Sequence, residues 1–320
     1  MKRARMFGNG LMRFAACAVM VLVCAGGAWG QSIAPINPAF RQWQKERKQR
    51  EAKRMTGTNA VARTKRLLSV SGAEGEEGFG LAPEIFDTSY LANLNTGMQQ
   101  GIQDGFVSRY DLREKGVLTP VRNQGSYGTC WAHATCSSLE SCALNEGKGT
   151  YDFSENNMAN LHGFDWGFND GGNASISSAY LLRWGGPVLE SLDPYPNPGG
   201  SIERAPARHV QNVRWVPGRT SYLDNDAIKA AIVENGALYV GYYHASSYYR
   251  SRTASYYFNG NTLRKINHAV AVVGWNDNYS KTNFSPPPPG DGAFIVRNSW
   301  GSSWGDGGYF YVSYYDESFA

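Results

Sequence analysis

The sequence has 320 residues, enough for one large domain or two modest ones, and it is rich in glycine (37) and tyrosine (19). That composition favours a loop-rich, strand-containing globular fold over a helical bundle. The formal charge of +4 is unevenly distributed: residues 1–105 carry 14 Lys and Arg against 8 Asp and Glu, whereas residues 106–320 carry 17 against 19. The later part therefore lacks the basic character of a nucleic-acid-binding protein.

The first thirty residues have the pattern of a secretory signal peptide. Four basic residues lie in or before the apolar run FAACAVMVLVCAGGA, and residues 28–30 (AWG) form a small-x-small cleavage site. A transmembrane anchor is the weaker alternative, because the run is shorter than the roughly 20 residues of a membrane-spanning helix. A lipoprotein is weaker still, because Val23 precedes Cys24 where a small residue is expected. We therefore expect a secreted or periplasmic protein with no stable membrane span.

Residues 31–105 are expected to form a basic N-terminal region and a linker. Residues 39–66 hold 10 basic residues against 2 acidic ones. The stretch FRQWQKERKQREAKRM could form a helix, but its apolar face is too thin to fold alone. The stretch SGAEGEEGFG (71–80) is typical of a linker.

Residues 106–320 are predicted to form an α+β domain. Helical spacing runs through CWAHATCSSLESCALNEG, ASISSAYLLRWGG and NDAIKAAIVENG, the last with Asp224 or Asn225 as its N-cap. Strand patterns follow in ALYVGYY, HAVAVVGW, GAFIVRNSW and YFYVSYY. Helices before strands predict a helical part that faces an antiparallel sheet.

The stretch NQGSYGTCWAHATC (123–136) places a cysteine where a reactive thiol would be expected. Cys130 follows a turn-forming segment and begins a predicted helix, whose unpaired N–H groups and partial positive charge favour a thiolate. Gln124 supplies an amide donor that, with the Cys130 backbone N–H, could hold the oxyanion of an acyl-transfer intermediate. The alternative is a core cysteine, which packs like any small apolar residue.

His268 and Asn298 are the predicted base and its orienting partner. His268 begins the apolar strand HAVAVVGW, and Asn298 follows the next strand. Antiparallel pairing that sets Gly274 opposite Gly292 also sets His268 opposite Asn298. Asn298 could then accept from one ring nitrogen and leave the other facing the thiol. Without such a partner, a histidine on an apolar strand is more often a core residue.

Four motifs, in order, resemble the papain-like cysteine peptidases. DLREKGVLTPVRNQG, GTCWA, NHAVAVVGW and RNSWGSSWGDGGYF are similar to the family's mature N-terminus, nucleophile segment, His strand and Asn segment. The resemblance implies a papain-like fold in which a helical lobe with the nucleophile helix packs against an antiparallel sheet lobe. It also implies an endopeptidase that acts on proteins or peptides through a thioester, with no cofactor. Its catalytic residues would be Cys130, His268, Asn298 and Gln124.

The resemblance also suggests substrate-binding residues. NDGGN is similar to the family's glycine segment, whose backbone pairs with the substrate, so Gly171 and Gly172 are candidates. Ile266 and Asn267 precede the predicted base and are expected to line an uncharged S2 pocket that prefers apolar P2 side chains. Trp300 is a further candidate and could shield the His–Asn hydrogen bond from water.

Some positions depart from the plant and animal members of the family. Tyr127 stands where those enzymes carry a disulfide cysteine, His133 replaces the usual Phe, and the sequence ends soon after YFYVSYY. These departures resemble the secreted bacterial branch, some of whose members carry a lectin-like domain after such a strand.

The remaining cysteines and histidines are expected to be structural. Six helical residues separate Cys136 from Cys142 by about 9 Å of rise, beyond the roughly 7 Å that a disulfide spans, so both should be reduced. With Cys130 they make an odd number of thiols in an exported chain. His133 and Glu140 are expected to pack in the core, and no cluster at ligand spacing predicts a metal site.

Residues 31–105 are also the predicted propeptide. The family resemblance implies a prosegment across the active site, and the basic stretch is opposite in charge to residues 106–320, so we expect a zymogen that its own propeptide inhibits. A disordered tail without effect is the alternative. For the whole protein, the competing function is a catalytically weak or inactive binding or adhesion protein on the same fold. The filled catalytic positions favour the peptidase, and the motif order disfavours a transglutaminase or amide hydrolase.

Overall fold

The computed structural model describes residues 35–56, 79–87, 105–260 and 266–320. The predicted signal peptide lies outside the described residues, as does most of the predicted linker. Among the helices that are described, none is both long enough and apolar enough to cross a membrane.

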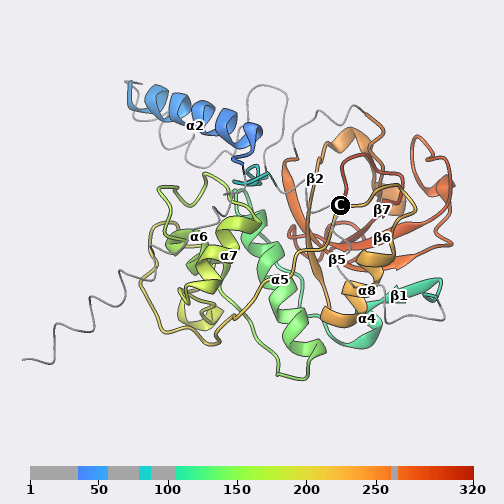
Figure 1. The fold of residues 1–320 in the computed structure, drawn as a ribbon, viewed down its shortest axis with the longest axis horizontal. Helices are drawn as coiled ribbons and strands as arrows, with labels where there is room; N and C mark the ends of the chain where they lie inside the picture. The colour runs from blue at the N-terminus through green and yellow to red at the C-terminus, as the bar shows by residue number, and fades with distance from the viewer. Residues whose placement is uncertain (1–34, 57–78, 88–104, 261–265) are drawn as a thin grey trace, which may run out of the picture. The chain divides into compact units, whose positions relative to one another are not determined.

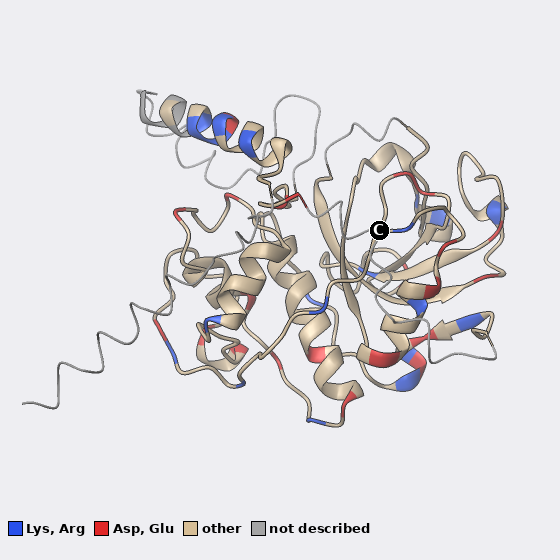
Figure 2. Ribbon diagram, in the orientation of Figure 1, with Lys and Arg blue, Asp and Glu red and all other residues tan. Residues whose placement is uncertain are grey.

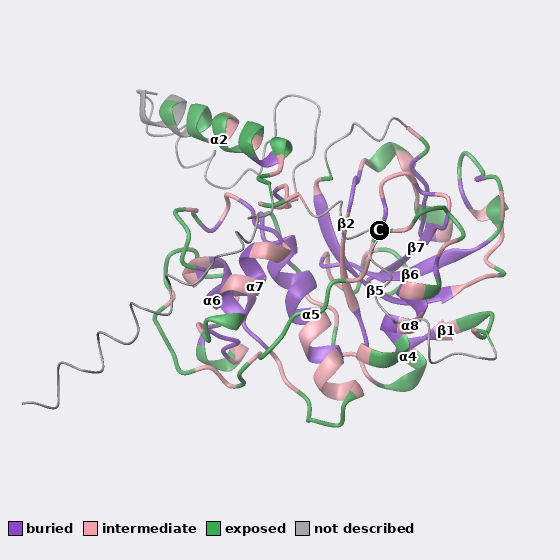
Figure 3. Cartoon of the chain, in the orientation of Figure 1, coloured by how far each residue is buried: buried purple, intermediate pink, exposed green. Residues whose placement is uncertain are grey.

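The helical part is built around α5 (Cys130–Asn145), which packs against α6 (Glu155–Leu161) and α7 (Ala174–Leu182) (Figure 1). These helices share an apolar core that includes Trp131, Met158 and Tyr180. Figure 3 shows that the first turns of α5 are buried. Helix α5 also contacts strand β5, so it lies between the helical core and the sheet.

The sheet has seven strands in the order β1-β5-β6-β7-β4-β3, and β2 also pairs with β5. The strands are β1 (Arg109–Asp111), β2 (Leu238–Tyr242), β3 (Tyr249–Arg250), β4 (Ser255–Tyr256), β5 (His268–Asn276), β6 (Ala293–Arg297) and β7 (Tyr309–Ser313). All pairs are antiparallel except β4 with β7. The expected antiparallel sheet therefore contains one parallel pair.

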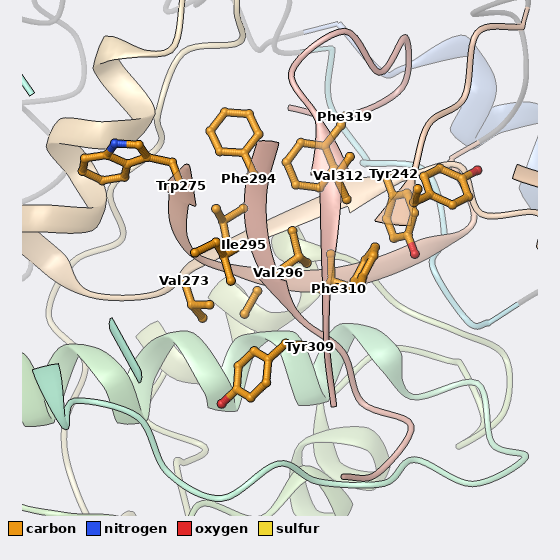
Figure 4. Close-up of a cluster of buried hydrophobic side chains, with 14 of the residues drawn as sticks. Tyr242, Val273, Trp275, Phe294, Ile295, Val296, Tyr309, Phe310, Val312 and Phe319 are labelled. Atoms are coloured by element: carbon orange, nitrogen blue, oxygen red, sulfur yellow. The ribbon is translucent and has the colours of Figure 1, made fainter. Parts of the chain in front are cut away.

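Large apolar side chains fill the core of the sheet part. Trp275, Phe294 and Phe310 are fully buried there (Figure 4). Helices α4 (Leu112–Lys115) and α8 (Asp226–Asn235) also contact β5. The short 3₁₀ turns are η4 (Glu190–Leu192), η5 (Ser246–Tyr248), η6 (Ser251–Thr253) and η7 (Lys281–Asn283).

The predicted capping of α8 is only partly correct. Asn225 is the N-cap residue, but its side chain makes no capping hydrogen bond. Asp224 instead accepts from the backbone N–H and the hydroxyl of Thr220, at 3.0 and 2.7 Å. Both polar side chains therefore stabilise the loop that leads into α8.

The predicted register of β5 and β6 is wrong. Gly274 pairs with Ile295 instead of Gly292, and the register shifts between Val272 and Gly274. Val272 already pairs with Val296, two residues from the position that simple counting gives, and the bulge adds one more residue at Gly274. Gly274 is required there, because a Cβ would lie 2.2 Å from the Tyr110 carbonyl oxygen of β1.

The basic helix predicted near the N-terminus is present as α2 (Pro38–Thr56). Figure 2 shows its Lys and Arg residues along the helix. Arg47 donates to Asp170 at 3.1 Å and to the Asp165 carbonyl at 2.9 Å. The Trp43 ring packs 4.6 Å from the Trp166 ring, between centroids. A few aromatic and charged contacts thus attach α2 to the helical part.

Candidate active site

The structure brings Cys130, His268 and Asn298 together. Cys130 begins α5, His268 begins β5 and Asn298 directly follows β6, and all three are buried. The His268 Nε2 lies 2.8 Å from the Asn298 Oδ1. The backbone N–H of Ala269 donates to the Cys130 sulfur at 3.4 Å, so the thiol lies beside the first residues of β5. Among the described residues the His268 Nδ1 has no hydrogen-bond partner, which leaves it available to the thiol.

Gln124 is held from both ends of its amide. Its Oε1 accepts from the Ser299 hydroxyl at 2.6 Å, and its Nε2 donates to the carbonyls of Tyr127 at 2.8 Å and Phe79 at 3.1 Å. The Ser299 backbone N–H also donates to the Asn298 Oδ1 at 2.8 Å. Ser299 thus connects the orienting Asn to the predicted oxyanion donor. Sequence reasoning missed it, and its only signal was its position directly after Asn298.

Aromatic rings enclose the imidazole. Trp300 stacks on His268 with 4.8 Å between centroids and 13° between planes. Trp304 packs edge-on against Trp300 at 4.8 Å. His244, to which the sequence analysis gave no role, lies 5.0 Å from Trp300 and bonds to the Tyr242 hydroxyl at 2.9 Å. The position of Trp300 agrees with a shield over the His–Asn bond.

A short N-terminal segment, residues 79–84, lies along the site. Leu81 forms a parallel bridge with Gly172. The Gly172 N–H donates to the Gly80 carbonyl at 2.9 Å, and the Ala82 N–H donates to the Gly172 carbonyl at 2.8 Å. On the other side the Leu81 N–H donates to the Asn267 carbonyl at 3.4 Å. The linker expected over residues 71–80 is therefore wrong at its end, because Phe79 and Gly80 bond to the site itself.

The glycines of NDGGN allow this close approach. Gly171 has a φ of +87°, and a Cβ there would lie 2.5 Å from the Gly80 carbonyl oxygen. A Cβ on Gly172 would come within 2.3 Å of the Trp131 ring. A side chain at Gly171 would therefore meet the bound backbone, whereas Gly172 makes the hydrogen bonds to that backbone.

Leu81 lies beside Ile266, where the side chain that fills the expected S2 pocket would lie. A Cβ on Gly241 would lie 2.8 Å from the Leu81 Cδ2 and 3.0 Å from the Ile266 Cγ2, so the absence of a side chain at Gly241 makes room for leucine. The side-chain amide of Asn267 bonds to the His244 backbone at 2.7 and 2.9 Å, and its carbonyl accepts from the Leu81 N–H at 3.4 Å.

The buried pair is neutral beneath this segment. Burial raises the pKa of the Cys130 thiol to about 12, although backbone hydrogen bonds oppose the rise. Burial and the neighbouring His244 lower the pKa of His268 to about 3, against the effect of its bond to Asn298. The Phe79 ring lies 4.9 Å from the His268 ring. For the Cys130 thiol, desolvation thus outweighs the favourable N–H groups at the helix N-terminus.

The other titratable groups of α5 are structural. His133 Nδ1 lies 3.0 Å from the Thr129 carbonyl, and burial lowers its pKa to about 4. Glu140 is buried and accepts from the Thr119 hydroxyl and the Phe153 N–H. The cysteines of the described chain, Cys130, Cys136 and Cys142, are all free. Within those same residues, no group of His, Cys, Asp and Glu could hold a metal ion.

Comparison with known proteins places this site in a family. Residues 106–318 match the papain family cysteine proteases. The chain belongs to that family. Cysteine proteinase 15A of Pisum sativum is 31% identical over 214 residues, which cover 63% of this chain and 56% of that protein. Cysteine proteinase 3 of Entamoeba histolytica is 29% identical over 203 residues, 62% of this chain and 61% of that protein.

Solved structures of the papain family include bacterial relatives. The clostridial cysteine protease Cwp84 after propeptide cleavage is 34% identical with a TM-score of 0.59, over 66% of this chain and 54% of that one. The cysteine protease and lectin-like domains of Cwp84, a surface layer associated protein of Clostridium difficile, are 27% identical with a TM-score of 0.65, over 89% and 58%. This chain spans little more than half the length of these relatives. The predicted α+β papain-like fold is confirmed.

Proposed function

We propose that this chain is an exported cysteine endopeptidase made as a latent precursor. The observation that carries the proposal is the joint placement of Cys130, His268, Asn298 and Gln124. The bond between His268 and Asn298 is 2.8 Å long, and the Gln124 amide already holds a backbone carbonyl, that of Phe79. An inactive binding protein would have no need to keep all four groups in this arrangement.

The chemistry follows from these positions. The Cys130 proton passes to the free Nδ1 of His268, and the sulfur attacks the carbonyl carbon of a peptide bond. The negative charge moves to the carbonyl oxygen, where the Gln124 Nε2 and the Cys130 backbone N–H stabilise it. The tetrahedral intermediate collapses to a thioester as His268 gives its proton to the leaving amine. Water, deprotonated by His268, then hydrolyses the thioester and restores the thiol.

Residues 79–84 support latency because they occupy the site with the wrong polarity. The leaving amine must lie beside His268, so the C-terminal part of a substrate belongs on the side of Trp300. In this chain the N-terminal residue of the segment, Phe79, takes that side, with its ring 5.0 Å from Trp300. Residues 80–84 continue along Gly172, where the N-terminal part of a substrate would lie. The segment therefore blocks the site without presenting a cleavable bond.

Export is supported by the signal-like first thirty residues and by the similarity to a surface layer associated protein. N-terminal sequencing of the protein recovered outside the cytoplasm should place its first residue close to position 31. A protein that retains residues 1–30 after fractionation would contradict export through a cleaved signal.

The activity itself is tested by comparing the wild-type chain with Cys130→Ala after removal of the N-terminal region. The wild type should cleave a fluorogenic peptide with leucine at P2 and react with a thiol-directed epoxide at Cys130. Cys130→Ala should do neither. A wild-type chain that neither cleaves peptides nor takes up the epoxide would favour the binding-protein alternative.

A further inference from the structure

The carboxylate of Glu84 occupies a set of hydrogen-bond donors at the start of α7. Its Oε1 accepts from the Ala174 N–H at 3.0 Å, and its Oε2 accepts from the Ser175 N–H at 3.1 Å and from the Ser175 hydroxyl at 2.5 Å. The N-cap side chain of α7, Asn173, bonds to a different donor, the Ile176 N–H. The first two N–H groups of the helix are thus satisfied by Glu84.

These donors favour a carboxyl group over an amide. Each of the two oxygens of Glu84 accepts from a backbone N–H. An amide in the same place would point its own N–H₂ donor at one of these N–H groups. Burial raises the pKa of Glu84, and the bonds from Ser175 and Ala174 oppose that rise. The three donors therefore select a carboxyl group over an amide by hydrogen bonding as well as by charge.

A second feature points to a ligand at this place. The hydroxyl of Tyr239, on β2, is buried and has no hydrogen-bond partner among the described residues. After burial itself, the Glu84 carboxylate contributes most to the raised pKa of that hydroxyl. Tyr239 and Ala174 line the same cavity, so an unused donor borders the cavity that the start of α7 also lines.

The Ala174 and Ser175 donors come directly after the backbone that binds residues 80–82, that of Gly172. From Leu81, beside Gly172, the chain passes Pro83, whose carbonyl accepts from the Asn173 side chain at 2.7 Å, and reaches Glu84. When the segment leaves, the Ala174 and Ser175 donors lose their acceptor, and unpaired N–H groups at a helix start attract anions. A substrate bound along the same edge would bring its N-terminal residues to these donors.

We propose that, in the activated enzyme, the start of α7 is a substrate subsite for an acidic side chain. This inference rests on the proposed peptidase function. P2 is the residue that binds where Leu81 lies. The acidic side chain would belong to P3, P4 or P5, and P5 is as far from P2 as Glu84 is from Leu81. The subsite would direct cleavage to sequences with Asp or Glu upstream of an apolar P2 residue.

The test uses the full-length chain after proteolytic activation and quenched peptides with leucine at P2. Glutamate and glutamine are compared at P3, P4 and P5 in turn. We expect kcat/KM to be about tenfold higher for glutamate at one of these positions, as for hydrogen bonds that gain a charged partner.

The variant that removes donors combines Ala174→Pro with Ser175→Ala. Proline suits the first helical position, and the preceding residue, Asn173, is extended, so α7 should persist. This variant keeps one of the three donors, the Ser175 N–H, so most of the glutamate preference should be lost. Ser178→Ala is the matched control, because its hydroxyl donates to the Ala174 carbonyl instead, and it should keep the preference.

Two results would overturn the subsite. Glutamate and glutamine peptides cleaved equally at all three positions would exclude it while leaving the peptidase function intact. So would a glutamate preference that survives unchanged in the double variant. If the activated chain cleaves none of the peptides, the proposed function fails and the subsite fails with it.

Discussion

At the residue scale, the site depends on a few side chains that are each fixed by a second one. Asn298 fixes His268, and Ser299 fixes Gln124 through a bond of 2.6 Å. Both fixing groups come from consecutive positions after β6. A short stretch of chain therefore holds both the proposed base and the proposed oxyanion donor in place.

Gln124→Ala should lower kcat by about 10² to 10³ with little change in KM, the usual effect of losing one oxyanion donor. The reason is that the Gln124 amide contacts the carbonyl oxygen most strongly once it carries charge. Gln211→Ala, at an exposed position, is the control and should behave as wild type. A kcat that is unchanged in Gln124→Ala would remove this residue from the mechanism.

The thiol of Cys130 should respond to pH differently before and after activation. In the latent chain its pKa is raised to about 12 and that of His268 is lowered to about 3, so between these values the pair is thiol and neutral imidazole. Alkylation by iodoacetamide should therefore be slow through neutral pH and rise only toward alkaline pH. Once the segment is removed and the pair is solvated, alkylation should be fast already at mildly acidic pH. Equal rates for the two forms would show that residues 79–84 do not cover the thiol.

At the element scale, the segment 79–84 predicts how latency can be weakened, and helix α5 predicts the state of its cysteines. The segment approaches Gly128, in the loop before α5, so closely that only glycine fits at position 80. Gly80 has a φ of +106°, and a Cβ there would lie 2.2 Å from the Gly128 backbone. Helix α5 instead spaces its cysteines along its axis.

Gly80→Ala should weaken latency, because the added methyl and the unfavourable φ both push the segment off the site. We expect the uncleaved chain to show an initial rate at least about tenfold above wild type. Gly147→Ala is the control, since Gly147 has a φ of +66° but open space around its Cβ position. A Gly80→Ala chain as inactive as wild type before cleavage would contradict the docking of this segment.

Cys136 and Cys142 should remain reduced in the folded protein. Both are free in the structure, and burial raises the pKa of each thiol, so both should also react slowly. Mass spectrometry without a reductant should find both peptides unlinked. A disulfide between the two peptides, with a mass two hydrogens lower, would mean that α5 does not hold Cys136 and Cys142 apart.

At the scale of the whole molecule, the proposed latency depends on how the N-terminal region contacts residues 106–320. The contacts are of two kinds. Segment 79–84 bonds along the site, whereas α2 contacts the helical part through Arg47 and the aromatic pair Trp43 and Trp166. The basic helix thus contacts the helical part, and the segment that bonds along the site is a separate stretch of the chain.

Removal of the whole N-terminal region should therefore release activity. A chain of residues 106–320 should cleave a fluorogenic peptide from the first time point. A chain of residues 31–320 should show a lag that ends as a shorter band appears on a gel. Full activity of the longer chain before any processing would refute latency.

The sequence by itself determined several of the main helices and strands and named the residues of the candidate site. Helical and alternating patterns are local properties, so α5, α7, α8, β5, β6 and β7 could all be predicted from them. Cys130, His268, Asn298 and Gln124 could be named because each stands in a short motif that resembles the papain-like peptidases. Local patterning and motif chemistry need no knowledge of distant contacts.

Only the tertiary structure decided how these parts meet. Gly274 pairs with β1 on one side and β6 on the other, and the register shift beside it cannot be counted along the chain. Ser299 reaches Gln124, and Phe79 reaches His268, across long separations in sequence. A glycine-rich stretch such as 71–80 is compatible with many conformations, and its bonding to the site is fixed by partners supplied from elsewhere in the fold. Packing decided these contacts because their energy comes from burial and hydrogen bonds between distant segments, which local propensity does not encode.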